Sequence, residues 1–128
     1  MKEFDSEYCS VKYLEEESAV LLTWKKFSCG DNYRLPTTFA LDLFAEQQAK
    51  YYIVDARHGF EDEKEDALWV KETLLPKMAK TSLKTVVFVM ENANEIKEEM
   101  DMWTLEFGKY FTVKKACTVK EALKLIKG

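Results

Sequence analysis

The stretch that decides the fold reads Lys50-Tyr51-Tyr52-Ile53-Val54-Asp55-Ala56-Arg57-His58-Gly59. Four apolar or aromatic residues lead directly into a carboxylate, an arginine and the only histidine of the sequence. A short apolar run bounded by polar residues is typical of a buried strand. Asp55, Arg57 and His58 would then lie where this strand ends at the edge of a sheet and the chain turns out to water.

Strand-like runs also occur on both sides of this stretch. Residues 8–14 and 19–27 flank an acidic turn at residues 15–18, and they predict an antiparallel hairpin. Residues 85–90, which read Thr-Val-Val-Phe-Val-Met, predict a central strand that is buried on both faces. Residues 110–113 predict a last strand.

Helical spacing fills the intervals between these strands. A first helix is expected to run to about Lys50, with Pro36 in its first turn, where the missing N–H of proline has no partner to lose. A second helix covers roughly residues 62–80. It contains Pro76, which is expected to kink or split it, because proline removes a hydrogen bond and clashes with the preceding turn.

Capping residues indicate the limits of two further helices. Asn92 or Asn94 is expected to cap the third helix, and Gly108 to end it. Thr118 and Glu121 have the spacing of a capping box, with Thr118 at the N-cap of the fourth helix.

The order of these elements predicts a single α/β domain over residues 1–128. It consists of a β-hairpin followed by a right-handed (βα)4 winding, with a mixed five-stranded sheet and four main helices. Successive crossovers in one direction would place the helices mainly on one face of the sheet. Because the strands are apolar on both faces, the other face needs a cover, and a homodimer is one hypothesis for it.

Composition excludes several classes of function. The chain has 47% hydrophobic and 33% charged residues and a net charge of -4, which gives no reason to expect nucleic-acid binding. We expect no secretory signal and no membrane insertion, because no apolar run approaches the ~20 residues that cross a bilayer. Cys9, Cys29 and Cys117 lack C-x-x-C spacing, which predicts reduced thiols in a cytoplasmic protein.

The polar residues after the predicted strands are the candidates for a site. Asp55, Arg57 and His58 follow one strand, and the next two are followed by Glu91, Asn92, Asn94, Lys114 and Lys115. The sequence contains no cluster of metal ligands, no glycine-rich phosphate loop and no nucleophile elbow. We therefore expect no cofactor, no metal and no catalytic residues. His58 is either an acid–base group or a solvated loop histidine, and an enzyme hypothesis would depend on Asp55, Arg57 and His58 alone.

Three side chains are candidates for specific contacts. Arg34 and Arg57 are the only arginines among 19 basic residues, and each is expected to bind a specific partner, within the chain or outside it. Trp69 falls opposite the apolar stripe of the second predicted helix. Either a neighbouring element covers Trp69, or it contacts another protein.

The chain resembles the STAS family of SpoIIAA-like anti-sigma-factor-antagonist domains, and in detail the stand-alone bacterial members. The resemblance depends on the hairpin-then-(βα)4 order and on Trp24, Tyr33-Arg34, Val54-Asp55-Ala56-Arg57, Trp69 and Pro76. In phospho-regulated members, a phosphorylated serine or threonine occupies the position of Arg57. Arg57 carries the opposite charge, and no serine or threonine occurs between Thr38 and Thr73.

The resemblance implies a non-catalytic, regulatory protein-binding module without the phosphorylatable hydroxyl. Its partner protein is unidentified, and its expected contact residues are Asp55, Arg57, His58, Trp69 and Arg34. The alternative is a carrier of a small apolar ligand or lipid. A carrier would need a pocket of several hundred Å3. The rings of Phe39, Phe44 and Trp103 would line such a pocket, or they would simply fill the core.

Overall fold

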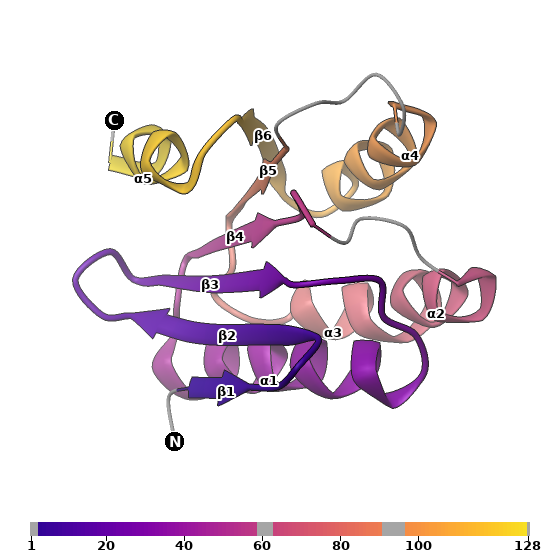
Figure 1. Cartoon of the computed structure of the whole chain (residues 1–128). Coiled ribbons are helices and arrows are strands. Elements are labelled where there is room, and N and C mark those ends of the chain that lie inside the picture. Colours follow the sequence, from indigo (N-terminus) through magenta and orange to yellow (C-terminus); the bar gives the residue numbers. More distant parts are fainter. Residues whose placement is uncertain (1–2, 59–62, 91–96, 128) are drawn as a thin grey trace.

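The computed structural model describes residues 3–58, 63–90 and 97–127, which form an α/β structure around one mixed six-stranded sheet (Figure 1). The strands cross the sheet in chain order: β1 (Glu3–Asp5), β2 (Cys9–Leu14), β3 (Ala19–Trp24), β4 (Tyr51–Asp55), β5 (Thr85–Val89) and β6 (Thr112–Ala116). Strand β2 is antiparallel to both of its neighbours, β1 and β3, and β3 to β6 are parallel.

Two strand predictions need correction. The sheet has six strands, because β1 adds to the edge of the hairpin. This strand has only three residues, and Glu3 and Asp5 on either side of Phe4 are exposed, so its sequence carries little apolar pattern. The last strand begins at Thr112, two residues later than predicted. Lys114 and Lys115 therefore lie inside β6, and they do not follow its end.

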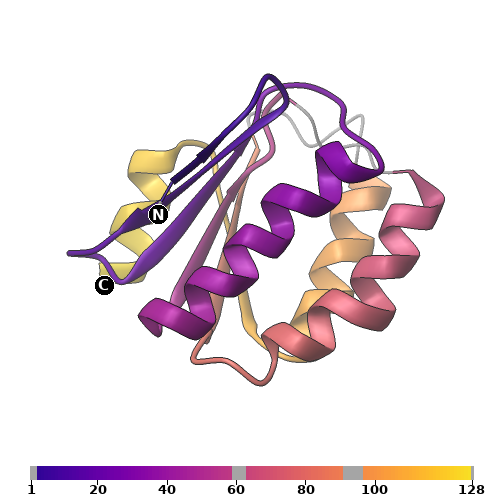
Figure 2. The same cartoon turned by 90° about the horizontal axis from the view of Figure 1, so that it is seen from below.

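The four predicted helical regions are present. They are α1 (Asp31–Gln47); a second region composed of α2 (Lys64–Trp69), η1 (Val70–Leu74) and α3 (Leu75–Met78); α4 (Lys97–Gly108); and α5 (Val119–Lys127). Figure 2 shows the first three regions on one face of the sheet and α5 on the other. Right-handed crossovers between neighbouring parallel strands account for the shared face. No helix within the described ranges is long and apolar enough to cross a membrane.

The start of α1 differs from the prediction. The helix begins at Asp31, so Pro36 lies inside it and not in the first turn. Gly30 occupies the N-cap with a φ of 58°, a backbone conformation that favours glycine. Because the residues around this N-cap are typical of a turn, the first helical turn was not recognised from the sequence.

The second helical region is split near Pro76, as predicted. A π-helical turn, η1, separates α2 from α3. The N–H of Leu75 donates to the carbonyl of Val70, five residues earlier. This wide turn comes immediately before Pro76, which has no N–H to donate and whose ring clashes with a regular turn.

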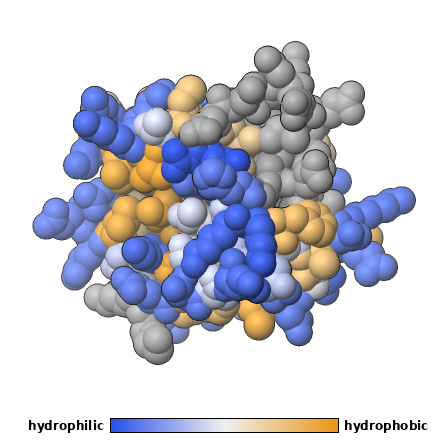
Figure 3. Space-filling model, viewed as in Figure 1, coloured by the Kyte–Doolittle hydropathy of each residue, from blue (hydrophilic) through white to orange (hydrophobic). Residues whose placement is uncertain are grey.

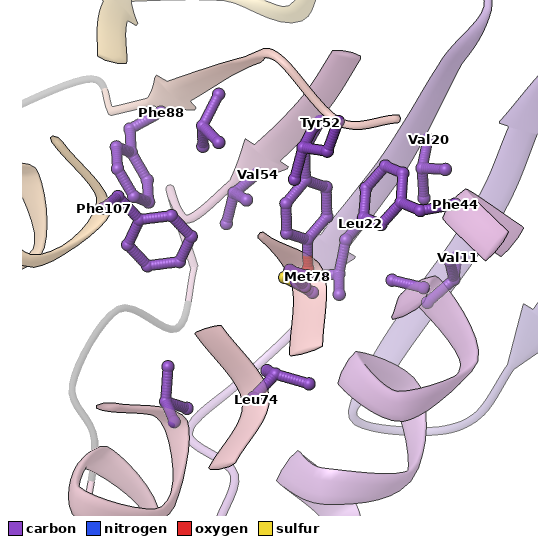
Figure 4. Packing of buried hydrophobic residues seen from close by; sticks show 14 of the residues in the cluster. Val11, Val20, Leu22, Phe44, Tyr52, Val54, Leu74, Met78, Phe88 and Phe107 are labelled. Carbon is purple, nitrogen blue, oxygen red and sulfur yellow. The ribbon is translucent and has the colours of Figure 1, made fainter. Parts of the chain in front are cut away.

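Two clusters of buried residues form the core, one on each face of the sheet. The larger cluster fills the space between the sheet and α1, η1, α3 and α4, where Phe44 packs edge-on against Tyr52, and Phe88 against Phe107 (Figure 4). The smaller one, under α5, consists of Ala19, Ile53, Val87, Val89, Ala116 and Ala122. The prediction that β5 is buried on both faces is confirmed, since Val86 to Val89 are all buried.

The capping predictions for the last two helices have different outcomes. Gly108 is the last residue of α4, as predicted, whereas Asn92 and Asn94 lie outside the described residues. At α5 the N–H of Glu121 donates to Thr118 Oγ1 at 3.1 Å, which confirms Thr118 as the N-cap. The Glu121 carboxylate accepts from the N–H of Cys117 at 3.4 Å, one residue before the position that a capping box uses.

This cap makes a testable contribution to stability. We expect Thr118→Ala to lower the free energy of unfolding by about 1 kcal/mol, because the first turn of α5 loses its side-chain acceptor. Chemical denaturation followed by circular dichroism measures the change. The control is Lys120→Ala, an exposed site in the same helix that leaves the cap intact. Equal stability of the Thr118→Ala variant and the wild type would show that the cap does not hold α5.

Candidate functional site

The end of β4 carries an ion pair between Asp55 and Arg57. The side chain of Asp55 is 3% exposed, and its two carboxylate oxygens accept from Arg57 Nε at 2.9 Å and Nη2 at 2.7 Å. The backbone N–H of Arg57 also donates to Asp55 Oδ1, at 3.3 Å. A bidentate pair of this kind fixes both side chains and satisfies the buried carboxylate. The prediction that Arg57 binds a specific partner is therefore confirmed, and that partner is within the chain.

His58, by contrast, is exposed to solvent. The neighbouring carboxylate that would have to assist it is already bound on both oxygens by Arg57. A general acid or base must lie within hydrogen-bond reach of the group with which it exchanges a proton. The geometry at the end of β4 is therefore that of a structural ion pair beside a solvated histidine.

Arg34 forms a second ion pair, with a carboxylate that the sequence did not single out. Arg34 Nε donates to Asp66 Oδ1 at 2.9 Å, and the backbone N–H of Gly30 donates to Asp66 Oδ2 at the same distance. The Asp66 side chain is 3% exposed. One buried carboxylate on α2 thus binds both the loop before α1 and the first turn of α1.

Trp69 lies against the other side of Arg34. The guanidinium carbon of Arg34 is 5.2 Å from the centre of the Trp69 ring, which is within the range of a cation–π contact. Trp69 is half-buried and packs against the larger core cluster. The prediction that neighbouring elements cover this residue is confirmed for part of the indole, and the remainder reaches solvent. A contact between Trp69 and another protein stays a prediction.

The sheet separates these two pairs of residues. Side chains alternate along β4, so Asp55 shares a side with Ile53, which packs under α5. Arg34 and Trp69 belong to α1 and α2, on the opposite side (Figure 2). Four of the five residues expected to form one contact surface therefore form two pairs, Asp55 with Arg57 and Arg34 with Trp69.

Three large apolar side chains close in sequence to the residues of the Arg34–Asp66 bridge are exposed. Phe27 is 46% exposed, Leu35 57% and Leu68 52%. Phe27 precedes the loop that Asp66 holds, Leu35 follows Arg34, and Leu68 precedes Trp69. Figure 3 shows hydrophobic surface on the right of the molecule, in the region of α2 and the β3–α1 loop. We call Phe27, Arg34, Leu35, Leu68 and Trp69 the Arg34 surface.

Asp66 is the central residue that sequence reasoning missed. It belongs to an acidic run, residues 61–66, that resembles a solvated helix start. One signal was present: Asp66 lies four residues before Val70 and therefore on the same helical face as the apolar stripe. A carboxylate on such a stripe needs a buried partner. Glu91, like Asn92 and Asn94, lies outside the described residues.

A small cavity lies between the sheet and the helices. Its volume is about 40 Å3, and its aromatic lining consists of Trp24, Tyr33, Tyr52, Phe88, Trp103 and Phe107. A cavity that holds benzene has a volume of roughly 150 Å3. Phe44 is fully buried and packs against Tyr52, while Phe39 packs against Phe4. These rings fill the core, and a lipid does not fit the cavity as it stands.

The three cysteines differ in exposure, and this difference predicts their reactivity. Burial raises the pKa of the Cys9 thiol to about 12, whereas Cys29 and Cys117 are exposed. At roughly pH 8, we expect Cys29 and Cys117 to react with a thiol reagent and Cys9 to stay protonated and shielded until unfolding. Mass spectrometry of the labelled protein identifies the sites. Labelling of Cys9 as fast as Cys29 would contradict the burial.

The bond network of Asp66 can be tested by removing its charge. We expect Asp66→Asn to lower the free energy of unfolding by about 1–3 kcal/mol, because two hydrogen bonds lose their charged acceptor. Thermal and chemical denaturation measure the loss. The matched control is Asp101→Asn, the same change at an exposed position of α4. If both variants lost equal stability, the bridge would not be the cause.

Comparison with protein-family models, curated proteins and solved structures found no match to this chain.

Proposed function

We propose that this chain is a non-catalytic protein-binding module whose main contact surface is the Arg34 surface. The observation that carries the proposal is that Arg34 contacts both the Asp66 carboxylate and the Trp69 ring, while Leu35 and Leu68, their neighbours in the chain, are exposed. Of the five residues predicted to contact a partner, this surface includes Arg34 and Trp69, which belong to α1 and α2.

The residue types of this surface support protein binding. Tryptophan and arginine are the side chains most enriched among the residues that dominate binding energy at protein interfaces. Asp66 and Trp69 already restrict the side chain of Arg34. Arg34 would therefore lose little conformational entropy when a partner binds. The exposed side chains of Phe27, Leu35 and Leu68 add apolar surface area. Removal of this area from water on binding would favour the complex.

The regulatory role is inferred from the resemblance to the STAS family. The hairpin, the parallel strands in chain order and the helices between them agree with that resemblance at the level of an α/β fold. Arg57 stands where phospho-regulated members carry a hydroxyl, and its guanidinium is bound to Asp55. We therefore propose a partner protein whose binding does not depend on phosphorylation of this loop.

A carrier of lipids or apolar ligands is a weaker alternative. The cavity beside Trp103 has about 40 Å3, less than any drug-sized ligand occupies. Native mass spectrometry of protein purified without added ligand tests the alternative directly. A co-purified apolar molecule would favour a carrier.

The Arg34 surface can be tested by affinity capture from a lysate of the source cells. We expect the double variant Leu35→Ser and Leu68→Ser to lose most of the captured partner, because exposed apolar contacts are removed without altering the Asp66 bridge. Quantitative mass spectrometry of the bound proteins measures the loss. The control is Leu105→Ser, which changes an exposed leucine of α4 that is 67% exposed. A partner retained equally by both variants would disprove the proposed surface.

A further inference from the structure

On the face of the sheet that carries α5, only some of the strands are covered by a helix. Helix α5 packs over β4, β5 and β6. Over β1 to β3 the same face carries exposed or half-buried side chains, among them Glu3, Lys12 and Leu21. This face therefore has the shape of a step, with a raised half formed by α5 and a lower half formed by the hairpin (Figure 2).

Apolar side chains lie along the step. Leu14, Leu21, Tyr51, Leu123 and Ile126 pack against the smaller core cluster but are only half-buried. We call these five residues the α5 patch. Figure 3 shows hydrophobic surface on the left of the molecule, between α5 and β3, with hydrophilic side chains around it.

A group of lysines lies on one half of the step and a group of glutamates on the other, although Glu121 on α5 and Lys12 on β2 have the opposite sign to their surroundings. Lys120, Lys124 and Lys127 form an exposed stripe on the solvent side of α5, at positions i, i+4 and i+7. The β2–β3 turn in the lower half carries Glu15, Glu16 and Glu17. The two halves meet where Lys127 Nζ lies 4.0 Å from Glu17 Oε1.

We propose that the α5 patch binds a second copy of this chain in a two-fold symmetric dimer. A two-fold axis would place α5 of each copy over the hairpin of the other, so that both lower halves are filled. The lysine stripe of one copy then faces Glu15 and Glu16 of its partner, and this contact occurs twice. The half-buried leucines of the α5 patch are removed from water.

Charge favours a second copy over other occupants. A uniformly acidic partner or an anionic membrane would be attracted to α5 but repelled by the glutamates of the turn. A basic partner would be attracted to these glutamates but repelled by the lysines of α5. A surface with one basic and one acidic half is complementary to itself under a two-fold rotation. The Arg34 surface lies on the other face of the sheet, so it stays free for a different partner.

The experiment exchanges charge between the two halves. The first variant carries Lys120→Glu and Lys124→Glu on α5, and the second carries Glu15→Lys and Glu16→Lys on the turn. Sedimentation velocity and light scattering of the full chain measure association up to roughly 1 mM. We expect a wild-type dimer and at least roughly tenfold weaker self-association of each variant, because two attractive contacts become repulsive.

Mixing the two variants gives the decisive result. In a two-fold dimer of one copy of each, both contacts again pair lysines with glutamates. We therefore expect the mixture to recover the wild-type association, which misfolded variants could not do. Leu21→Gln should also weaken the dimer, and Leu105→Gln, on the opposite face, should not. A monomeric wild type throughout the concentration range, or a mixture no stronger than its components, would overturn the proposal.

Discussion

The structure depends on one topological constraint, the right-handed crossover between parallel strands that follow each other in chain order. From β3 to β6 every connection crosses in the same direction, so α1, the α2–α3 region and α4 must all lie on one face. Only the helix after the last strand is free of this rule. That helix, α5, is nine residues long and cannot cover a six-stranded sheet. The unequal burial of the two faces is therefore a consequence of the winding itself.

A buried carboxylate organises the helical face at the carboxyl ends of the strands. Burial of a charged group costs free energy unless hydrogen bonds compensate for it, and Asp66 obtains them from the Gly30 N–H and from Arg34. Those two bonds fix the loop after β3, the first turn of α1 and the position of α2 against each other. They also hold the guanidinium of Arg34 against Trp69. The guanidinium of Arg34 thus stabilises the fold through Asp66 and also forms part of the exposed Arg34 surface.

The sequence predicted elements whose signal is local and missed those that depend on distant partners. Runs of apolar and β-forming residues located β2 to β5, and the Thr118 cap and the Pro76 split follow from hydrogen bonding within one turn. Strand β1 is stable only through its pairing with β2, and three residues carry no periodicity. The local pattern places Asp66 on the apolar face of its helix, but it does not identify the partner, because Gly30 is 36 residues away. Both arginines were expected to have specific partners, and both have them.

The candidate site illustrates the limit of reasoning from strand ends. A carboxylate, an arginine and a histidine after a buried strand suggest reactive chemistry when they are read as a list. In space, Arg57 occupies both oxygens of Asp55, so the charges that looked available are used to satisfy each other. The two surfaces that we propose for binding lie instead where apolar side chains are partly exposed: the ring of Trp69 with its neighbouring leucines on one face, and the step beside α5 on the other. Because the sheet stands between these two surfaces, a partner on one does not compete for space with a partner on the other, and substitutions on each can be interpreted independently.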